Sequence, residues 1–347
     1  MRAILFFLFL FVQLSCNAQQ TAVTAIHFTK QVIFLLDSSQ AAGAITTDRY
    51  DNFFQLVRPV EMSIQMKQTL PPTPDRRAMQ AAYEDFLQRD VENFTAQESQ
   101  FVDKVMRDVY KTIESVAPNI CPDTLLLIKT KGRHYGDGVY YTRGNCIIIP
   151  ADALRARNRS AFASTMYHEL FHVYSRLNPE KRKALYRLIG FESIGLDKVH
   201  LPEKLASRVL FNPDGVDFAQ KITLKLDDGR TIHAVPVIYA NHDGFSEQQP
   251  TFFDYLQFNL YPIEARADGQ WNLVTKADSL SSPLNVSSLT DFYRQIKDNT
   301  GYIIHPDEVL ADNFAYLMQS KSNPVITARF SPGGKQLLVD FEKILKQ

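Results

Sequence analysis

The sequence predicts an α+β fold in which a small antiparallel or mixed sheet packs against one long helix. Apolar, β-branched residues fill the segment 124–130, and a second such run over 138–150 contains a turn, so we expect a strand followed by a hairpin. Helical periodicity begins directly after the hairpin and covers 161–177 and 180–189. Because strands and helices are segregated along the chain rather than alternating, the pattern is typical of α+β proteins.

The part of the chain before these strands indicates a mainly helical N-terminal region over 19–118. Residues 24–66 mix apolar and polar side chains without a clear period, so we expect short helices there. Three prolines in the polar run 69–80 mark a linker or the entry to a helix. From 76 to 116, apolar residues recur at helical spacing, which predicts long amphipathic helices.

Local signals bound the central elements. The hairpin is expected to turn at Arg143-Gly144-Asn145. Ser160 is a suitable N-cap for the helix that follows, and Gly190 is a suitable end for the next one. Each of these residues favours the end of an element over its interior.

A region over about 199–300 separates the central elements from the last helices. Turn sequences such as Asp227-Asp228-Gly229 indicate hairpins and loops there. Helices are expected again over 289–297, 306–319 and 334–345. We interpret 199–300 as an insertion within one domain that extends from 119 to 347.

The first residues indicate export. Arg2 precedes the apolar run 3–12, which is too short for the ~20 residues that a helix needs to span a bilayer. A signal peptide over 1–18, removed after Ala18, accounts for this pattern and predicts a secreted or periplasmic protein. The alternative is a lipid anchor at Cys16, although Gln13 stands where such signals usually have leucine.

Cysteine and charge content limit which disulfides and binding partners can be expected. Cys121 and Cys146 remain after the signal, and in an oxidising compartment they either form a disulfide or stay as two buried thiols, which spacing does not decide. The 38 basic residues balance the 38 acidic ones, so nothing indicates a nucleic-acid partner. No second apolar stretch approaches the length of a membrane span.

The stretch "YHELFHVYSR" over 167–176 predicts a metal site. His168 and His172 are four residues apart, so a helix presents both imidazoles on one face, where they can bind one ion. Glu169 lies at the edge of that face, where it can take a proton from a water without binding the metal itself. Arg176, at the end of this helix, is the kind of cation that supports a helix C-terminus, and the segment 212–214, "NPD", is noted without an assigned role.

A catalytic zinc site needs a third protein ligand. The segment "HPDEVLADNFAYL" over 305–317 supplies Glu308 and Asp312, again four residues apart. With these residues the chain resembles the gluzincin superfamily of zinc metallopeptidases, of the thermolysin type. The resemblance implies a zincin-like domain, Zn²⁺ as cofactor, Glu308 as third ligand, and Asp312 as the carboxylate that orients a ligand histidine. It also implies that the strand 145–150 lies along the cleft and pairs with an extended peptide substrate.

The spacing of the third ligand departs from the family. Glu308 follows His172 by 136 residues, whereas thermolysin-like proteins place this ligand about twenty residues on, close to where Glu192 stands here. Glu192 has no aspartate four residues later, because that position is Leu196. We prefer Glu308, since a long insertion adds little loop-closure entropy and the aspartate partner is chemically useful.

A peptidase also needs a donor that stabilises the oxyanion formed at the scissile carbonyl. Tyr302 and His305 precede Glu308 and are our candidates. Tyrosine is common in protein cores, and the other candidates, Tyr140, Tyr141 and His242, are residues that also fit structural roles.

The sequence therefore predicts an exported zinc peptidase in which His168, His172 and Glu308 bind the metal and Glu169 is the general base. The alternative is a non-catalytic exported binding protein with the same fold and a structural metal or none. A structural site has no use for Glu169 and usually closes its fourth position with a protein ligand.

Overall fold

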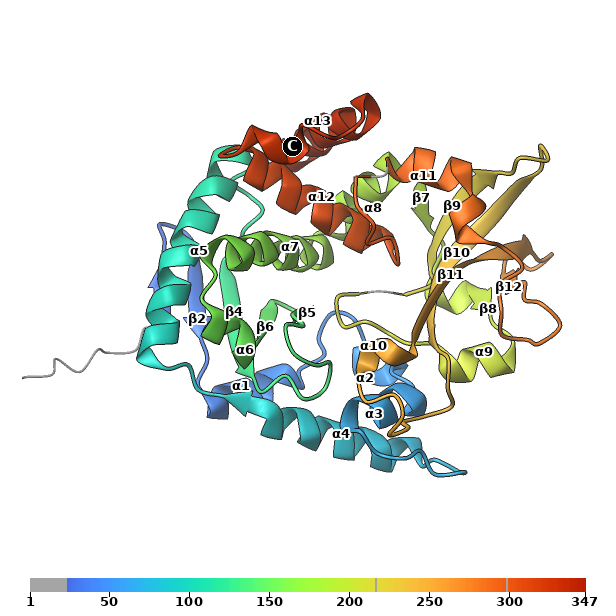
Figure 1. Cartoon of the computed structure of the whole chain (residues 1–347), viewed down its shortest axis with the longest axis horizontal. Helices are drawn as coiled ribbons and strands as arrows, with labels where there is room; N and C mark the ends of the chain where they lie inside the picture. Colours follow the sequence, from blue (N-terminus) through green and yellow to red (C-terminus); the bar gives the residue numbers. More distant parts are fainter. Residues whose placement is uncertain (1–23, 216, 298) are drawn as a thin grey trace, which may run out of the picture.

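The structure, a computed structural model, describes residues 24–215, 217–297 and 299–347. The predicted signal peptide and Cys16 lie outside these residues. The fold is a mixed α/β arrangement with two six-stranded mixed sheets, which agrees with the predicted α+β class (Figure 1). No helix of the described part of the chain is long and apolar enough to cross a membrane.

The first sheet has the order β1-β2-β4-β6-β5, with β3 paired to β4. Its strands are β1 (Ala25–His27), β2 (Val32–Leu35), β3 (Val91–Glu92), β4 (Thr124–Thr130), β5 (Tyr141–Arg143) and β6 (Cys146–Pro150). The predicted strand and hairpin are confirmed as β4 and β5–β6. The short strands β1 and β2 were not predicted, because three or four residues carry no readable period and β2 is fixed by parallel pairing with the distant β4.

The implied role of 145–150 as the strand that pairs with substrate is wrong. β6 lies inside the sheet, paired with β4 on one side and with β5 on the other. Its backbone groups over this stretch are therefore used within the sheet. The edge strand on this side is β5, which comes just before the turn of the hairpin.

Helices cover both faces of this sheet. One face packs on a core to which five helices contribute, namely α5 (Ala96–Val116), α7 (Arg159–Leu177), α8 (Pro179–Leu188), α12 (Pro306–Ser320) and α13 (Pro332–Lys346). The other face packs on α1 (Ser38–Ile45), α2 (Phe53–Leu56), α3 (Pro59–Met66), α4 (Arg76–Asp90) and α9 (Glu203–Arg208). The helix α6 (Ala151–Ala156) directly follows β6, and α11 (Thr290–Ile296) precedes α12.

The second sheet is built mainly from the region predicted as an insertion. Its order is β7-β9-β10-β11-β12-β8, and its strands are β7 (Phe191–Ser193), β8 (Val199–His200), β9 (Gln220–Lys225), β10 (Thr231–Ala240), β11 (Leu256–Ala265) and β12 (Trp271–Leu273). The short helix α10 (Phe252–Tyr255) connects β10 to β11. The predicted turn at 227–229 joins β9 to β10, where Gly229 adopts a left-handed conformation with φ of 85°.

The structure corrects the predicted N-cap of the metal-site helix. The helix α7 begins at Arg159 and is capped by Asn158, whose side chain accepts a hydrogen bond from the backbone N–H of Ala161. Ser160 therefore lies inside the first turn. The cap is Asn158 because its carboxamide oxygen reaches this free N–H group, which a side chain within the turn does not.

The alternative of a disulfide is not realised, since Cys121 and Cys146 are free cysteines. Cys121 packs against the α5 side of the first sheet, whereas Cys146 belongs to the core on the opposite face. Successive residues of a strand point to opposite faces, and the parity of Cys146 in β6 directs its side chain away from Cys121.

Candidate metal centre

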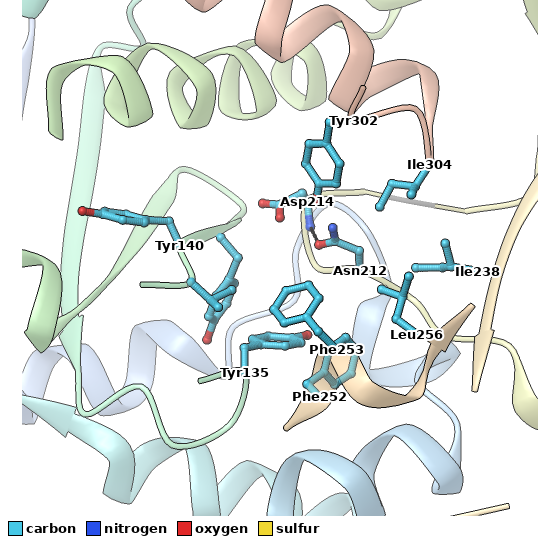
Figure 2. Close-up of a pocket in the computed structure, with 12 residues that line it drawn as sticks. Tyr135, Tyr140, Asn212, Asp214, Ile238, Phe252, Phe253, Leu256, Tyr302 and Ile304 are labelled. Carbon is cyan, nitrogen blue, oxygen red and sulfur yellow. Dashed lines mark hydrogen bonds between the residues drawn. The ribbon is translucent and has the colours of Figure 1, made fainter. Parts of the chain in front are cut away.

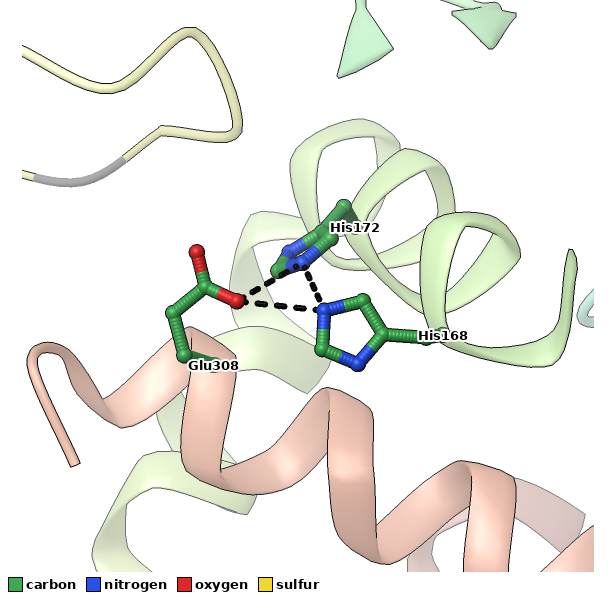
Figure 3. Close-up of side chains that lie close together, drawn as sticks. All are labelled: His168, His172 and Glu308. Atoms are coloured by element: carbon green, nitrogen blue, oxygen red, sulfur yellow. Dashed lines mark hydrogen bonds and ion pairs between the residues drawn. The ribbon is translucent and has the colours of Figure 1, made fainter. Parts of the chain in front are cut away.

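The helices α7 and α12 bring His168, His172 and Glu308 together (Figure 3). The Nε2 atoms of the two histidines are 3.0 Å apart. Oε2 of Glu308 lies 3.1 Å from Nε2 of His168 and 3.3 Å from Nε2 of His172. Glu192, by contrast, lies on β7 and forms an exposed ion pair with Lys221, so the structure places Glu308 beside the histidines.

The three donor atoms fit a zinc ion. Zinc with ligands at about 2.0–2.1 Å in tetrahedral geometry separates its ligand atoms by about 3.3 Å. The observed separations of 3.0–3.3 Å are close to this value. Two imidazoles and a carboxylate are also a ligand set that zinc accepts in catalytic sites.

Outer hydrogen bonds fix which nitrogen of each ring faces the site. Nδ1 of His168 lies 2.9 Å from Asp312, and Nδ1 of His172 lies 2.7 Å from Asp307. Because an ionised carboxylate only accepts hydrogen bonds, each Nδ1 carries a proton, and when the ring is neutral its Nε2 atom presents a lone pair to the site. In that neutral state three electron-rich atoms converge, an arrangement that a divalent cation stabilises.

The electrostatics of the cluster favour positive charge. Burial on its own lowers the pKa of His168, but its hydrogen bonds to Asp312 and Glu308 outweigh this and raise that pKa to about 10. Burial on its own raises the pKa of Glu308, yet the neighbouring histidines bring it below its ordinary value. The surrounding carboxylates thus favour positive charge at this position, which either a protonated imidazole or a bound divalent cation supplies.

Glu169 lies beside this cluster without being committed to it. Its side chain is buried, and its Oε2 atom has no hydrogen-bond partner among the described residues. Burial is the main cause that raises the pKa of Glu169 to about 8, and the nearby charge of Asp214 adds to it. Carboxylate oxygens of Glu169 and Asp214 lie with a His172 nitrogen within 4.8 Å of one another.

A loop of the second half of the chain, 212–214, supports the centre. The side-chain amide of Asn212 donates to Oε1 of Glu308 at 3.0 Å, which leaves Oε2 directed at the histidines. Arg176 donates to the backbone carbonyl of Pro213 at 2.8 Å and thereby ties this loop to the end of α7. Arg176 therefore does more than support a helix C-terminus.

Two adjoining cavities flank the centre. One is lined by His168, Glu169 and Asp312, and the other by Asn212, Asp214 and Tyr302. Both cavities share Val139, Tyr140 and Phe253 as walls, so they adjoin each other beside the metal centre, and the two together are the cleft. Figure 2 shows the second cavity, with Asn212 and Asp214 beside Tyr302 and the rings of Tyr135, Phe252 and Phe253 opposite.

The structure separates the two oxyanion candidates. Tyr302 lines the cleft, is 38% exposed, and stacks on the ring of His168 with a centroid separation of 6.2 Å. His305 is buried as the N-cap of α12, where its Nδ1 atom accepts a hydrogen bond from the backbone N–H of Asp307. His305 lines neither of the two cavities.

The other candidates for this role differ in the same way. Tyr140 lines both cavities. Tyr141 lines one, but its hydroxyl group is within 3.0 Å of Nε2 of His134. His242 bonds to Asn241 and lines neither cavity. Tyr302 and Tyr140 are therefore the tyrosines best placed to meet a substrate.

Three residues of the site were not predicted: Asp307, Asn212 and Asp214. Asp307 directly precedes Glu308, and a second carboxylate at that position is a signal that a second ligand histidine also needs a partner. The "NPD" segment was noted but lies 96 residues from Glu308, and no local pattern connects them.

Comparison of the chain with protein-family models, with curated proteins and with solved structures finds no match.

Proposed function

We propose that the chain is a zinc-dependent metallohydrolase of the gluzincin type, with a zincin-like domain that hydrolyses peptide bonds. The observation that carries this proposal is the convergence of His168, His172 and Glu308 beside an uncommitted buried carboxylate, Glu169. A purely structural metal site would have no use for Glu169. It would also not need a cavity beside its ligands, such as the one that His168 and Glu169 line.

Each residue has a distinct task in this proposal. A zinc ion, when bound, polarises a carbonyl group and lowers the pKa of water. His168, His172 and Glu308 hold the ion, while Asp312, Asp307 and Asn212 keep these ligands oriented.

Glu169 acts as the general base. Its free Oε2 atom accepts a proton from the attacking water and returns it to the leaving amine. The hydroxyl group of Tyr302 donates to the carbonyl oxygen of the substrate as negative charge develops there.

The peptide is expected to extend along the outer side of β5. β5 is the last strand of the sheet on this side, and the backbone N–H of Thr142 donates to Asp214. Tyr140 directly precedes β5, so a substrate that extends along this strand would pass its backbone. An extended substrate added there would run beside the cavities that Tyr140 lines.

Metal content and peptide cleavage test the proposal together. The chain produced from Gln19 and loaded with zinc should retain about one zinc per chain by elemental mass spectrometry. Glu308→Gln should lose the metal, and the matched change Glu192→Gln should not. Glu169→Gln should retain zinc but cleave a peptide library about 10²–10⁴-fold more slowly.

Two results would overturn the proposal. If the wild-type chain takes up no zinc, the metal centre is refuted. If zinc binds but Glu169→Gln and wild type are equally inactive on every peptide tested, the alternative of a metal-containing binding protein becomes the better interpretation.

A further inference from the structure

We infer that Asp214 selects a positively charged group of the substrate, which the aromatic cavity beside the metal centre holds next to the bond to be cleaved. The charged group is either a basic side chain or a free amino terminus. This inference rests on the proposed function, because it names the class of substrate for the same site.

The cavity combines aromatic rings with one charge. Its walls include Tyr135, Phe252, Phe253 and Tyr302, and Asp214 is the one charged side chain among its described lining residues (Figure 2). Aromatic faces attract cations through their ring quadrupoles, most strongly where water is excluded. An apolar substrate group would gain from the rings alone, but only a cation gains from both features.

Two of the other polar side chains of the cavity, Asn212 and Tyr135, are already engaged, and the hydroxyl groups of Tyr140 and Tyr302 carry no charge. The amide of Asn212 donates to Glu308, and its oxygen accepts from the backbone N–H of Asp214. The hydroxyl group of Tyr135 accepts a hydrogen bond from Gln65. Asp214 is therefore the main polar group that can determine what the cavity binds.

Asp214 is held in place without a cation of its own. It is 8% exposed, and its Oδ1 atom accepts hydrogen bonds from the backbone N–H and the hydroxyl group of Thr142. Among the described residues, Oδ2 accepts none. The charge of Arg176 acts on Asp214, but its guanidinium bonds to Thr142 and Pro213 and forms its ion pair with Asp51. A buried carboxylate without a paired cation is unfavourable, so a cationic ligand would supply what is missing.

Carboxylates also predominate around the centre. Five of them lie in or directly around it, namely Glu169, Asp214, Asp307, Glu308 and Asp312. A cationic substrate group is therefore better accommodated there than an anionic one.

The position of Asp214 places the selected group beside the reaction. A carboxylate oxygen of Asp214 lies within 4.8 Å of a carboxylate oxygen of Glu169. Tyr140 and Phe253 line both the aromatic cavity and the cavity that contains His168. A group in the aromatic cavity consequently belongs to a residue next to the scissile bond, not to a distant part of the peptide.

Binding to a cleavage-deficient variant tests the inference. Four heptapeptides are compared by calorimetry on zinc-loaded Glu169→Gln, with lysine or norleucine at the central position and with a free or an acetylated amino terminus. Norleucine keeps the aliphatic chain of lysine but lacks its charge. At least one cationic peptide should bind about tenfold more tightly than the peptide with norleucine and an acetylated amino terminus. The peptide that binds more tightly then shows whether the lysine side chain or the free amino terminus supplies the charge.

The double variant Glu169→Gln/Asp214→Asn should reduce this ratio to below about threefold. The control is Glu169→Gln/Asp152→Asn, which removes an equal charge from α6 near Tyr140 but outside both cavities. The inference is overturned if Asp214→Asn leaves the ratio unchanged, or if Asp152→Asn lowers it equally. If Asp214 selects cationic peptides but the wild-type chain cleaves no peptide, the peptidase proposal is refuted and the role of Asp214 in binding cations remains.

Discussion

Replacement of Asp307 by asparagine tests how the outer hydrogen bonds support the metal centre. Asp307 is 2% exposed and accepts hydrogen bonds from His172 on one oxygen and from Ser175 and Tyr186 on the other. Asparagine keeps the shape of this side chain and can still accept from His172. The change therefore removes mainly the negative charge behind the ligand.

The size of the effect follows from burial. Loss of such an outer partner typically weakens metal binding by 10–100-fold, or about 1.4–2.7 kcal/mol. The side chain of Asp312, which supports His168, is 24% exposed, and solvent screens its charge. We expect Asp307→Asn to weaken zinc binding about 100-fold, near the upper end of this range, and Asp312→Asn to weaken it about tenfold, near the lower end.

Competition with a chromophoric chelator measures zinc affinity for wild type and both variants. Asp340→Asn, an exposed carboxylate on α13, is the matched control and should leave the affinity unchanged. Circular dichroism of the zinc-loaded proteins checks that each variant is folded. If Asp307→Asn binds zinc as tightly as wild type, the orienting role derived from the 2.7 Å contact with His172 is wrong.

Three further outcomes are expected. Removal of zinc with a chelator should lower the melting temperature, because a ligand present at 1,000 times its Kd adds about 4 kcal/mol of stability; an unchanged melting temperature would contradict a folded-state metal site. Burial on its own raises the pKa of Glu98, but hydrogen bonds from Thr95 and Lys129 outweigh this and lower it below 4.5. Its stabilisation is then present above the unfolded pKa and lost as pH falls through the lower folded value, so urea midpoints of wild type and Glu98→Gln should converge in acid and separate near neutral pH. Since Cys121 and Cys146 are free, dithiothreitol should leave the melting temperature unchanged, and a decrease would indicate a bridge.

Local periodicity allowed much of the fold and half of the metal centre to be predicted. A helix places residues four apart on one face, so the pairing of His168 with His172, and of Glu308 with Asp312, follows from spacing once each segment is helical. The helices α7 and α12 were predicted within two residues of their observed ends. The hairpin of β5 and β6 followed in the same way from its turn and its β-branched strands.

Contacts between distant segments could not be predicted in this way. The short strands β1 and β2 are fixed by pairing, and the interior position of β6 follows from the parallel β4 beside it. The separation of Cys121 from Cys146 depends on which face of the sheet each side chain meets. Each of these features results from packing among segments far apart in the chain.

The sequence by itself therefore determined that His168, Glu169 and His172 lie close together on one helix, because these residues are neighbours through a fixed helical repeat. Only the tertiary structure decided that Glu308 rather than Glu192 lies beside the two histidines, that Asp307 contacts His172, and that Asn212 reaches Glu308. These contacts join residues about a hundred or more positions apart. They depend on how buried surfaces fit together, which no local repeat along the chain encodes.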